Sequence, residues 1–171
     1  MTLQPPRLIL MRHAKSDWSD AGLDDHSRPL NRRGRRDAPR MAQWLADSDL
    51  IPDVVLLSDS VRTTETLDLM IDQWSDVNQP ICNQTDDLYL AAAETIVSRV
   101  NSDHCDAETL LVLAHNPGIS VLASRLAGTE IGMPTAAMTV LLSDSDWSSL
   151  RPTSRLQQTA FVTPKSLGDH D

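Results

Sequence analysis

The chain is organised around one stretch, Arg7-Leu8-Ile9-Leu10-Met11-Arg12-His13-Ala14. Its four consecutive apolar residues, Leu8 to Met11, predict a short strand that is buried on both faces, as strands of parallel sheets are. Arg12 and His13 follow directly, and a cation and an imidazole are costly to bury without partners. At the carboxyl end of a strand in an open α/β sheet, where such sheets bind ligands, the two side chains can face a substrate. From this stretch alone, a strand that simply ends in polar residues is an equally good interpretation.

The same apolar pattern recurs along the chain, separated by helical patterns. A polar loop is expected over residues 15–29, and the predicted strands are residues 52–58, 81–84, 109–114, 138–142 and 161–162. Helices are predicted over residues 31–47, 61–74, 93–102 and 117–127. Strands that alternate with helices indicate an α/β fold. We therefore expect a three-layer α/β/α domain with a mostly parallel central sheet flanked by helices.

Several residues mark the predicted helix ends. Asn31 is expected to cap the first helix, and Gly128 is expected to stop the last. Pro39 either kinks the first helix or indicates a later start, because proline lacks the N–H group that a helix interior needs. Asn116 is expected to cap the last helix, with Pro117 at its first helical position.

Length and composition indicate one folded domain. With 171 residues, 40% of them apolar, the chain can bury a substantial core. We expect a single domain over residues 1–171, with a core at about 7–163 and a mobile tail at 164–171. Cys82 and Cys105 form no disulfide framework and no metal motif, which favours a reducing compartment. The chain start does not resemble a signal peptide and no apolar run is long enough to span a bilayer, so a cytoplasmic protein is expected.

The charge is unevenly distributed. The formal net charge is −9, yet residues 28–40 hold six arginines and one acid, Asp37, so the remainder carries fourteen net negative charges. This balance argues against nucleic-acid and membrane partners. A positive island in a negative protein suits a small anion that is guided locally, although most of these arginines are also consistent with a solvated helix face.

Arg62 and His115 stand where Arg12 and His13 do, just beyond a predicted strand. Arg62 falls in the first turn of a helix, where the macrodipole disfavours a cation unless the arginine and the free amides hold an anion together. His115 ends the strand at residues 109–114. A surface arginine is an equally good interpretation of Arg62 alone, and a lone histidine at this place is more often structural. Two histidines and two arginines at equivalent strand ends instead indicate one site.

These residue types fit a phosphoryl group. Two guanidinium groups can each donate two hydrogen bonds to its oxygens. A neutral imidazole is a competent nucleophile, and nearby arginines would disfavour its protonated form. A second histidine can donate to a phosphoryl oxygen as charge shifts in the transition state. The histidines and acids lack ligand spacing and no Walker or Rossmann pattern is present, so we expect neither a metal nor a cofactor.

Taken together, these residues resemble the histidine phosphatase superfamily. Arg12-His13-Ala14 looks like its Arg-His-Gly signature with alanine in the third place, and His115 matches its second histidine. The block from Ser58 through Arg62 to Thr66 resembles its Ser-x-x-x-Arg-x-x-x-Thr motif. The short chain and several further segments look most like the SixA-type phosphohistidine phosphatases: Arg28-Pro29-Leu30 followed by Gly34, Leu88-Tyr89, and His115-Asn116-Pro117-Gly118. The resemblance covers roughly residues 8–142.

The resemblance implies a metal-independent, two-step phosphatase. His13 would attack phosphorus and become phosphohistidine, and water would then release phosphate. Arg12, Arg62 and His115 would cradle the phosphoryl oxygens. Arg28 joins them by similarity to the SixA-type members, and Asn116 is assigned to substrate binding.

Larger superfamily members carry a carboxylic acid on an insertion for which this chain has little room. Asp86, Asp87 and Glu94 are the nearby candidates, and none fits a motif convincingly. A site without a strong proton donor suits phosphohistidine on a protein as the substrate. The imidazole of phosphohistidine leaves more readily than the alkoxide of a phosphate ester. The alternatives are a small-molecule phosphomonoesterase or mutase of the same superfamily and a non-catalytic phosphoprotein-binding module. The sequence does not decide the physiological substrate, the proton donor or the oligomeric state.

Overall fold

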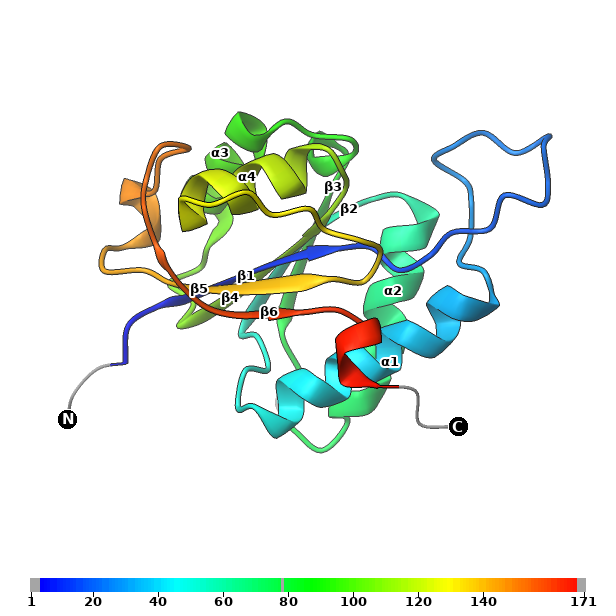
Figure 1. The fold of residues 1–171 in the computed structure, drawn as a ribbon, viewed down its shortest axis with the longest axis horizontal. Helices are drawn as coiled ribbons and strands as arrows, with labels where there is room; N and C mark the ends of the chain where they lie inside the picture. The colour runs from blue at the N-terminus through cyan, green and yellow to red at the C-terminus, as the bar shows by residue number, and fades with distance from the viewer. Residues whose placement is uncertain (1–3, 78, 169–171) are drawn as a thin grey trace.

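The computed structural model describes residues 4–77 and 79–168. A six-stranded sheet is covered by two helices on each face, as Figure 1 shows. The strands are β1 (Arg7–Arg12), β2 (Val54–Ser58), β3 (Ile81–Thr85), β4 (Thr109–Ala114), β5 (Met138–Leu142) and β6 (Gln157–Val162). The helices are α1 (Arg32–Asp47), α2 (Val61–Ile71), α3 (Ala93–Asp103) and α4 (Gly118–Ala127), with four short 3₁₀ helices, η1 (Asp72–Trp74), η2 (Asp86–Leu88), η3 (Trp147–Ser149) and η4 (Lys165–Leu167).

The sheet is mostly parallel, which confirms the predicted fold class. Its strand order is β3-β2-β4-β1-β5-β6. Neighbours β3, β2, β4 and β1 are parallel, whereas β5 runs antiparallel to both β1 and β6. The carboxyl ends of β1, β2 and β4 therefore meet at one edge of the sheet, where open α/β folds bind ligands.

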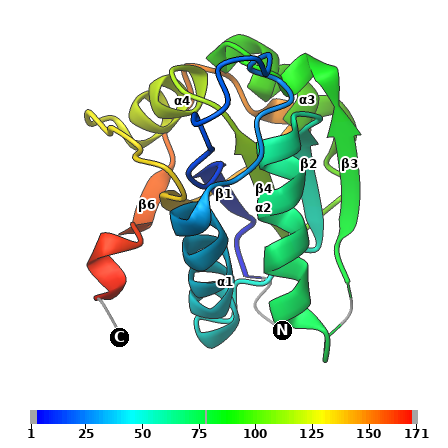
Figure 2. The same cartoon turned by 90° about the vertical axis from the view of Figure 1, so that its right-hand side faces the viewer.

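The central strand β1 is buried on both faces, as its apolar run predicts. Leu8 and Leu10 pack into the cluster under α3 and α4, while Ile9 and Met11 pack into the cluster under α1 and α2. All four side chains are completely buried. Alternate residues of a strand point to opposite faces, so a strand between two helix layers must be apolar throughout. Figure 2 shows α1 and α2 side by side on one of these faces.

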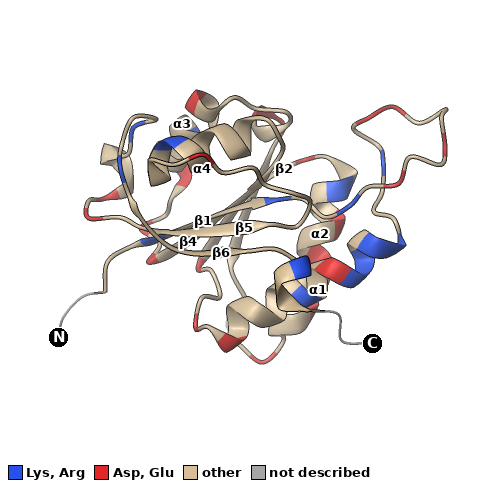
Figure 3. Ribbon diagram, in the orientation of Figure 1, with Lys and Arg blue, Asp and Glu red and all other residues tan. Residues whose placement is uncertain are grey.

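Helix α1 begins where its capping residue predicts. Asn31 has extended backbone geometry and its side chain accepts from the Gly34 amide at 2.9 Å. Pro39 lies inside the helix, which is continuous from Arg32, so the alternative of a later start is wrong. The positive island predicted from the sequence lies mainly on the first half of this helix (Figure 3).

Helix α4 begins one residue later than predicted. Pro117 is the N-cap residue rather than the first helical residue, and Asn116 makes no cap hydrogen bond. The Asn116 side chain is used elsewhere: its Nδ2 donates to the Met133 carbonyl at 3.0 Å and its Oδ1 accepts from Ser120 Oγ at 2.5 Å. Gly128 ends the helix in the left-handed conformation, with φ of 71°, as expected.

The carboxyl-terminal segment contains more secondary structure than predicted. Strand β6 is six residues long rather than two, and η4 follows it. Arg40 Nη2 donates to the carbonyl oxygens of Pro164 and Gly168, so this turn is tied to α1 up to Gly168. Residues 169–171 of the expected tail lie outside the described residues. Within the part of the chain that the structure describes, no helix is long and apolar enough to cross a membrane.

Candidate active site

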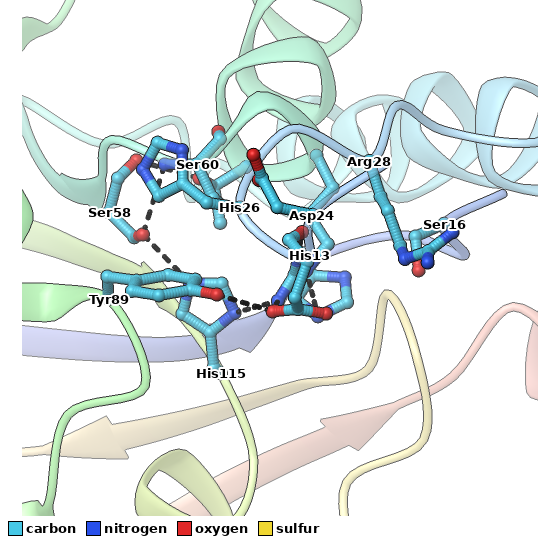
Figure 4. A network of polar contacts seen from close by, with 12 residues as sticks. His13, Ser16, Asp24, His26, Arg28, Ser58, Ser60, Tyr89 and His115 are labelled. Carbon is cyan, nitrogen blue, oxygen red and sulfur yellow. Dashed lines mark hydrogen bonds and ion pairs between the residues drawn. The ribbon is translucent and has the colours of Figure 1, made fainter. Parts of the chain in front are cut away.

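Three strand ends deliver basic side chains to one cavity. His13 follows β1, Arg62 lies in the first turn of α2 after β2, and His115 follows β4. The cavity has a volume of about 470 Å³ and is lined by these three residues together with Arg12, Lys15, Ser16, Trp18, Asp25, Leu90, Asn116 and Thr135. The imidazole rings of His13 and His115 have centroids 5.1 Å apart. Figure 4 shows these rings within one network of polar contacts.

The backbone determines the tautomer of His13. Its Nδ1 lies 2.7 Å from the Ala14 carbonyl oxygen, which can only accept a hydrogen bond, so Nδ1 carries the proton. The other ring nitrogen, Nε2, then holds the lone pair, and Arg62 Nε donates to it at 3.2 Å. His13 is therefore oriented with a basic nitrogen at the guanidinium group, where an anion would bind.

His115 is held in the opposite tautomer. Its Nε2 lies 2.8 Å from Ser58 Oγ, at the end of β2, and its Nδ1 lies 3.3 Å from Arg62 Nη2. Because the guanidinium nitrogen can only donate, Nδ1 is the acceptor and Nε2 carries the proton. Arg62 thus bridges the two imidazoles.

Both histidines are neutral near pH 7. Burial, with a smaller contribution from the charges of Arg62 and Arg12, lowers the pKa of His13 to about 4 against the opposing effect of the Ala14 carbonyl. Burial, followed by the proximity of His13 and Arg62, lowers the pKa of His115 to about 3. The arginines were expected to keep these imidazoles neutral, whereas burial is the larger cause.

Arg62 is held by the carboxylate of Asp25, a residue that was not among the predicted site residues. Its Nη2 lies 2.9 Å from Asp25 Oδ2, and its Nη1 donates to the Asp25 carbonyl oxygen at 2.5 Å. The Tyr89 hydroxyl donates to the same carboxylate at 2.5 Å. Burial opposes the charge of Asp25, but the hydrogen bonds from Tyr89 and Arg62 outweigh it and lower the pKa of Asp25. Asp25 is therefore ionised near pH 7.

Arg12 retains hydrogen-bonding capacity at the cavity. Its Nη1 donates to the Met133 carbonyl at 3.1 Å, while its buried Nε has no hydrogen-bond partner among the described residues. A buried donor without a partner is costly, so an anion that accepted from it would be favoured. Asn116 donates to the same carbonyl of Met133, and the two side chains together hold the loop between α4 and β5.

The structure does not bring Arg28 into this group. Its guanidinium donates to the backbone carbonyls of Asp20 at 2.9 Å, Leu23 at 3.0 Å and Asp17 at 3.5 Å. It also stacks on the Trp18 ring at 4.2 Å. Figure 4 shows it apart from the two imidazoles. Arg28 therefore holds the loop over residues 15–29 in shape, and Trp18 brings that loop to the cavity wall.

None of the three carboxylates considered as proton donors lines the cavity. Glu94 Oε1 lies 2.5 Å from Arg125 Nη1, and Asp87 Oδ2 lies 3.3 Å from Arg99 Nη1. The carboxylate at the cavity is Asp25, one of four aspartates in a loop without periodicity. The one sequence signal for Asp25 is its position three residues before the Arg28-Pro29-Leu30 segment. Among the described residues, no three His, Cys, Asp or Glu side chains are grouped as metal ligands.

Comparisons with known proteins agree with this geometry. Residues 8–89 match the model of the histidine phosphatase superfamily, branch 1. An uncharacterized protein of Mycobacterium tuberculosis is 34% identical over 153 residues, which cover 83% of this chain and 92% of that protein. The chain belongs to the histidine phosphatase superfamily. An uncharacterized chloroplastic protein of Arabidopsis thaliana is 35% identical over 79% of this chain, which spans 65% of that longer protein.

Solved structures of histidine phosphatases have the same fold. A SixA protein from Agrobacterium tumefaciens superposes with a TM-score of 0.78 and 26% identity over 94% of this chain and 99% of its own. The protein histidine phosphatase SixA in complex with tungstate gives 0.77 at 21% identity, over 94% and 99% of the two chains. In this member of the superfamily, the structure places the predicted residues Arg12, His13, Arg62 and His115 at one cavity.

Proposed function

We propose that this histidine phosphatase removes phosphate from phosphohistidine on a protein through a covalent intermediate on His13. The observation that carries the proposal is the arrangement of two neutral imidazoles bridged by Arg62. His13 Nε2 holds a lone pair beside the donors that would bind the phosphoryl oxygens. The similarity to SixA proteins supports the same assignment.

In the first step, His13 Nε2 forms a bond to phosphorus while the bond from phosphorus to the substrate imidazole breaks. Arg12 and Arg62 would stabilise the charge on the phosphoryl oxygens. An incoming dianion would raise the pKa of His115, so that a proton on Nδ1 could be donated to a phosphoryl oxygen. In the second step, water attacks phosphorus, phosphate leaves and His13 is regenerated.

The state of Asp25 favours phosphohistidine over phosphate esters. An ester releases an alkoxide, which needs a strong proton donor, whereas an imidazole leaves with little assistance because its pKa lies near neutrality. The carboxylate at the cavity is ion-paired with Arg62 and its pKa is lowered, so it is a poor acid near pH 7. The site therefore suits a leaving group that requires little protonation.

One observation favours a second function, a small-molecule phosphatase or mutase. The 2,3-bisphosphoglycerate-dependent phosphoglycerate mutase of Streptomyces avermitilis is 36% identical over 70 residues, which cover 40% of this chain and 28% of the mutase. Isomerisation of 3-phosphoglycerate at a rate exceeding phosphohistidine hydrolysis would establish this alternative. A non-catalytic binding module would accumulate no phosphorylated His13.

The decisive experiment is turnover of a phosphohistidine-bearing protein by the wild type and by His13→Ala. The substitution should lower kcat by several orders of magnitude, because it removes the nucleophile. His104→Ala is the matched control, since His104 caps α3 away from the cavity and should leave turnover unchanged. Acid-labile phosphate should be trapped on the wild type after rapid quenching. Equal turnover by His13→Ala, or comparable rates on several phosphomonoesters, would contradict the proposal.

A further inference from the structure

The arginines of α1 form a surface that the proposed chemistry does not use. We define the basic groove by Arg32, Arg33, Arg36, Arg40 and Lys165, which line two adjoining hollows beside the first half of α1. Figure 3 shows the basic residues concentrated on this part of the helix. Arg35 lies on the same helix but is paired with Glu65 at 3.3 Å, outside the groove.

A single buried carboxylate organises the groove. Asp37, whose side chain is 1% exposed, lies 3.5 Å from Arg33 Nε, 3.1 Å from Arg36 Nη2 and 3.6 Å from Arg40 Nη1. Three guanidinium groups share one negative charge, so two positive charges remain uncompensated there. The side chains of Arg33 and Arg36 are 55% and 60% exposed and therefore available to a partner. Their positions are set before any partner binds, which lowers the entropic cost of association.

The groove adjoins the candidate active site. Its two hollows, of about 540 Å³ and 670 Å³, share Arg33 and Arg36 as lining residues. Thr135 lines both the hollow beside Lys165 and the cavity that holds His13. A ligand bound in the groove can therefore be part of the same molecule whose phosphoryl group enters the cavity.

We propose that the basic groove binds an acidic segment of the protein whose phosphohistidine is the substrate, an inference that rests on the proposed function. Arg33 and Arg40 are separated by about 10 Å along the helix, at about 1.5 Å per residue. That span exceeds a single phosphoryl group. In an extended segment, alternate side chains share one face at intervals of about 7 Å, so three acidic side chains, which span about 14 Å, would cover it.

The charge of the rest of the molecule directs this binding. Outside residues 28–40 the chain carries fourteen net negative charges, which repel an acidic partner from other faces. Complementary charge at one place and repulsion elsewhere increase association rate and orientation specificity. The groove would thus select phosphoproteins with an acidic flank over small phosphate esters, which do not reach it.

Kinetics with a matched control test this inference. In the double variant Arg33→Gln/Arg36→Gln, we expect KM for a phosphohistidine-bearing protein with an acidic flank to rise about tenfold, as expected for about 1.4 kcal/mol. The kcat for that protein and all constants for para-nitrophenyl phosphate should stay unchanged. The control variant Arg35→Gln should behave as the wild type. Equal losses on both substrates, or no rise in KM, would overturn the inference.

A binding measurement separates this inference from the proposed function, because it needs no turnover. The probe is a fluorescein-labelled seven-residue peptide of alternating aspartate and serine without phosphate, followed by fluorescence anisotropy. It should bind the wild type and Arg35→Gln, weaken with added salt, and bind the double variant at least about tenfold more weakly. Equal binding to all three proteins, or no binding to the wild type, would overturn the groove assignment whether or not the protein hydrolyses phosphohistidine.

Discussion

His13 and His115 occupy equivalent strand ends but are prepared for different tasks. A carbonyl oxygen at Nδ1 leaves His13 with a basic Nε2. The Arg62 guanidinium, which can only donate, makes Nδ1 of His115 the acceptor, so that its Nε2 proton faces Ser58 Oγ. Arg62 contacts both accepting nitrogens. The difference between nucleophile and oxygen-binding group thus comes from the partners of each ring rather than from the residue type.

Asp25 competes with the phosphoryl group for Arg62, so Asp25→Asn should strengthen anion binding. The pair is partly exposed, with the Asp25 side chain 38% accessible, so we expect the inhibition constant of inorganic phosphate to fall by about fivefold, or roughly 1 kcal/mol. Steady-state inhibition measures it. Tyr89→Phe, which removes one hydrogen bond but keeps the charge, is the control and should change inhibition less. Weaker phosphate binding by Asp25→Asn would show that the carboxylate instead positions Arg62 for the anion.

Among individual residues, the sequence pattern predicts the site residues at strand ends but not the residues that hydrogen-bond to them. Arg12, His13, Arg62 and His115 follow apolar runs, which makes their common location predictable. Asp25 and the backbone partners of Arg28 lie in an aperiodic loop, where no local pattern shows which side chains turn inward. Ser58 belongs to the motif that resembles the superfamily, but its hydrogen bond to His115 depends on the packing of β2 beside β4 and was not predictable.

Two helices begin where the backbone of another segment passes very close. A Cβ atom on Gly34, in α1, would lie 2.3 Å from the Lys15 carbonyl oxygen. A Cβ atom on Gly118, the first residue of α4, would lie 1.8 Å from the Ala91 carbonyl oxygen. Backbone cannot yield as a flexible side chain can, so both positions require glycine. These contacts fix α1 against the loop at the cavity and α4 against the segment before α3.

Gly118→Ala should therefore destabilise the protein, by about 2 kcal/mol or more, because the added methyl group forces the backbone of Ala91 away. Urea unfolding monitored by circular dichroism measures the change. Gly132→Ala is the matched control, since a Cβ atom there meets nothing within 4 Å. Equal midpoints for the two variants would show that α4 shifts without cost.

Element boundaries show where local signals suffice. Asn31 caps α1 with its side chain, which accepts from the Gly34 amide, and Gly128 ends α4 with its left-handed backbone. Both signals act within their own helix, and both were predictable. Asn116 was predicted as a cap, but its side chain bonds to Met133 and Ser120 instead. A residue with several available partners is placed by tertiary contacts, which the sequence pattern does not contain.

The order of the strands in the sheet could not be predicted from the sequence pattern. Continuous apolar runs predict strands buried between helix layers, and β1 and β4 are such strands. The reversed direction of β5 depends on its pairing with β1 and β6, which involves residues far apart along the chain. The three-layer architecture was therefore predictable, while the mixed pairing was not.

Stability of the whole molecule should fall as the pH is lowered from about 6.5 to 4. The pKa values of His13, about 4, and His115, about 3, lie below the ordinary 6.5, so the unfolded chain binds protons there that the folded protein does not. Two such protons correspond to as much as about 2.7 kcal/mol per pH unit. Thermal unfolding between pH 4.5 and 7.5 tests this, and His115→Gln should show a shallower decline. Identical slopes would mean that His115 binds its proton over the same pH range in the folded protein as in the unfolded chain.

The hydrogen bonds from Arg28 to the loop over residues 15–29 affect how the protein could acquire new substrates. Among the described residues, the hydrogen bonds of Arg28 are all to main-chain oxygens, those of residues 17, 20 and 23. Main-chain oxygens are present whatever amino acid stands at those positions. The amino acids at these positions can therefore be replaced, in evolution or by directed mutagenesis, without loss of the oxygens that Arg28 binds. The main chain of the loop would keep its path above the cavity.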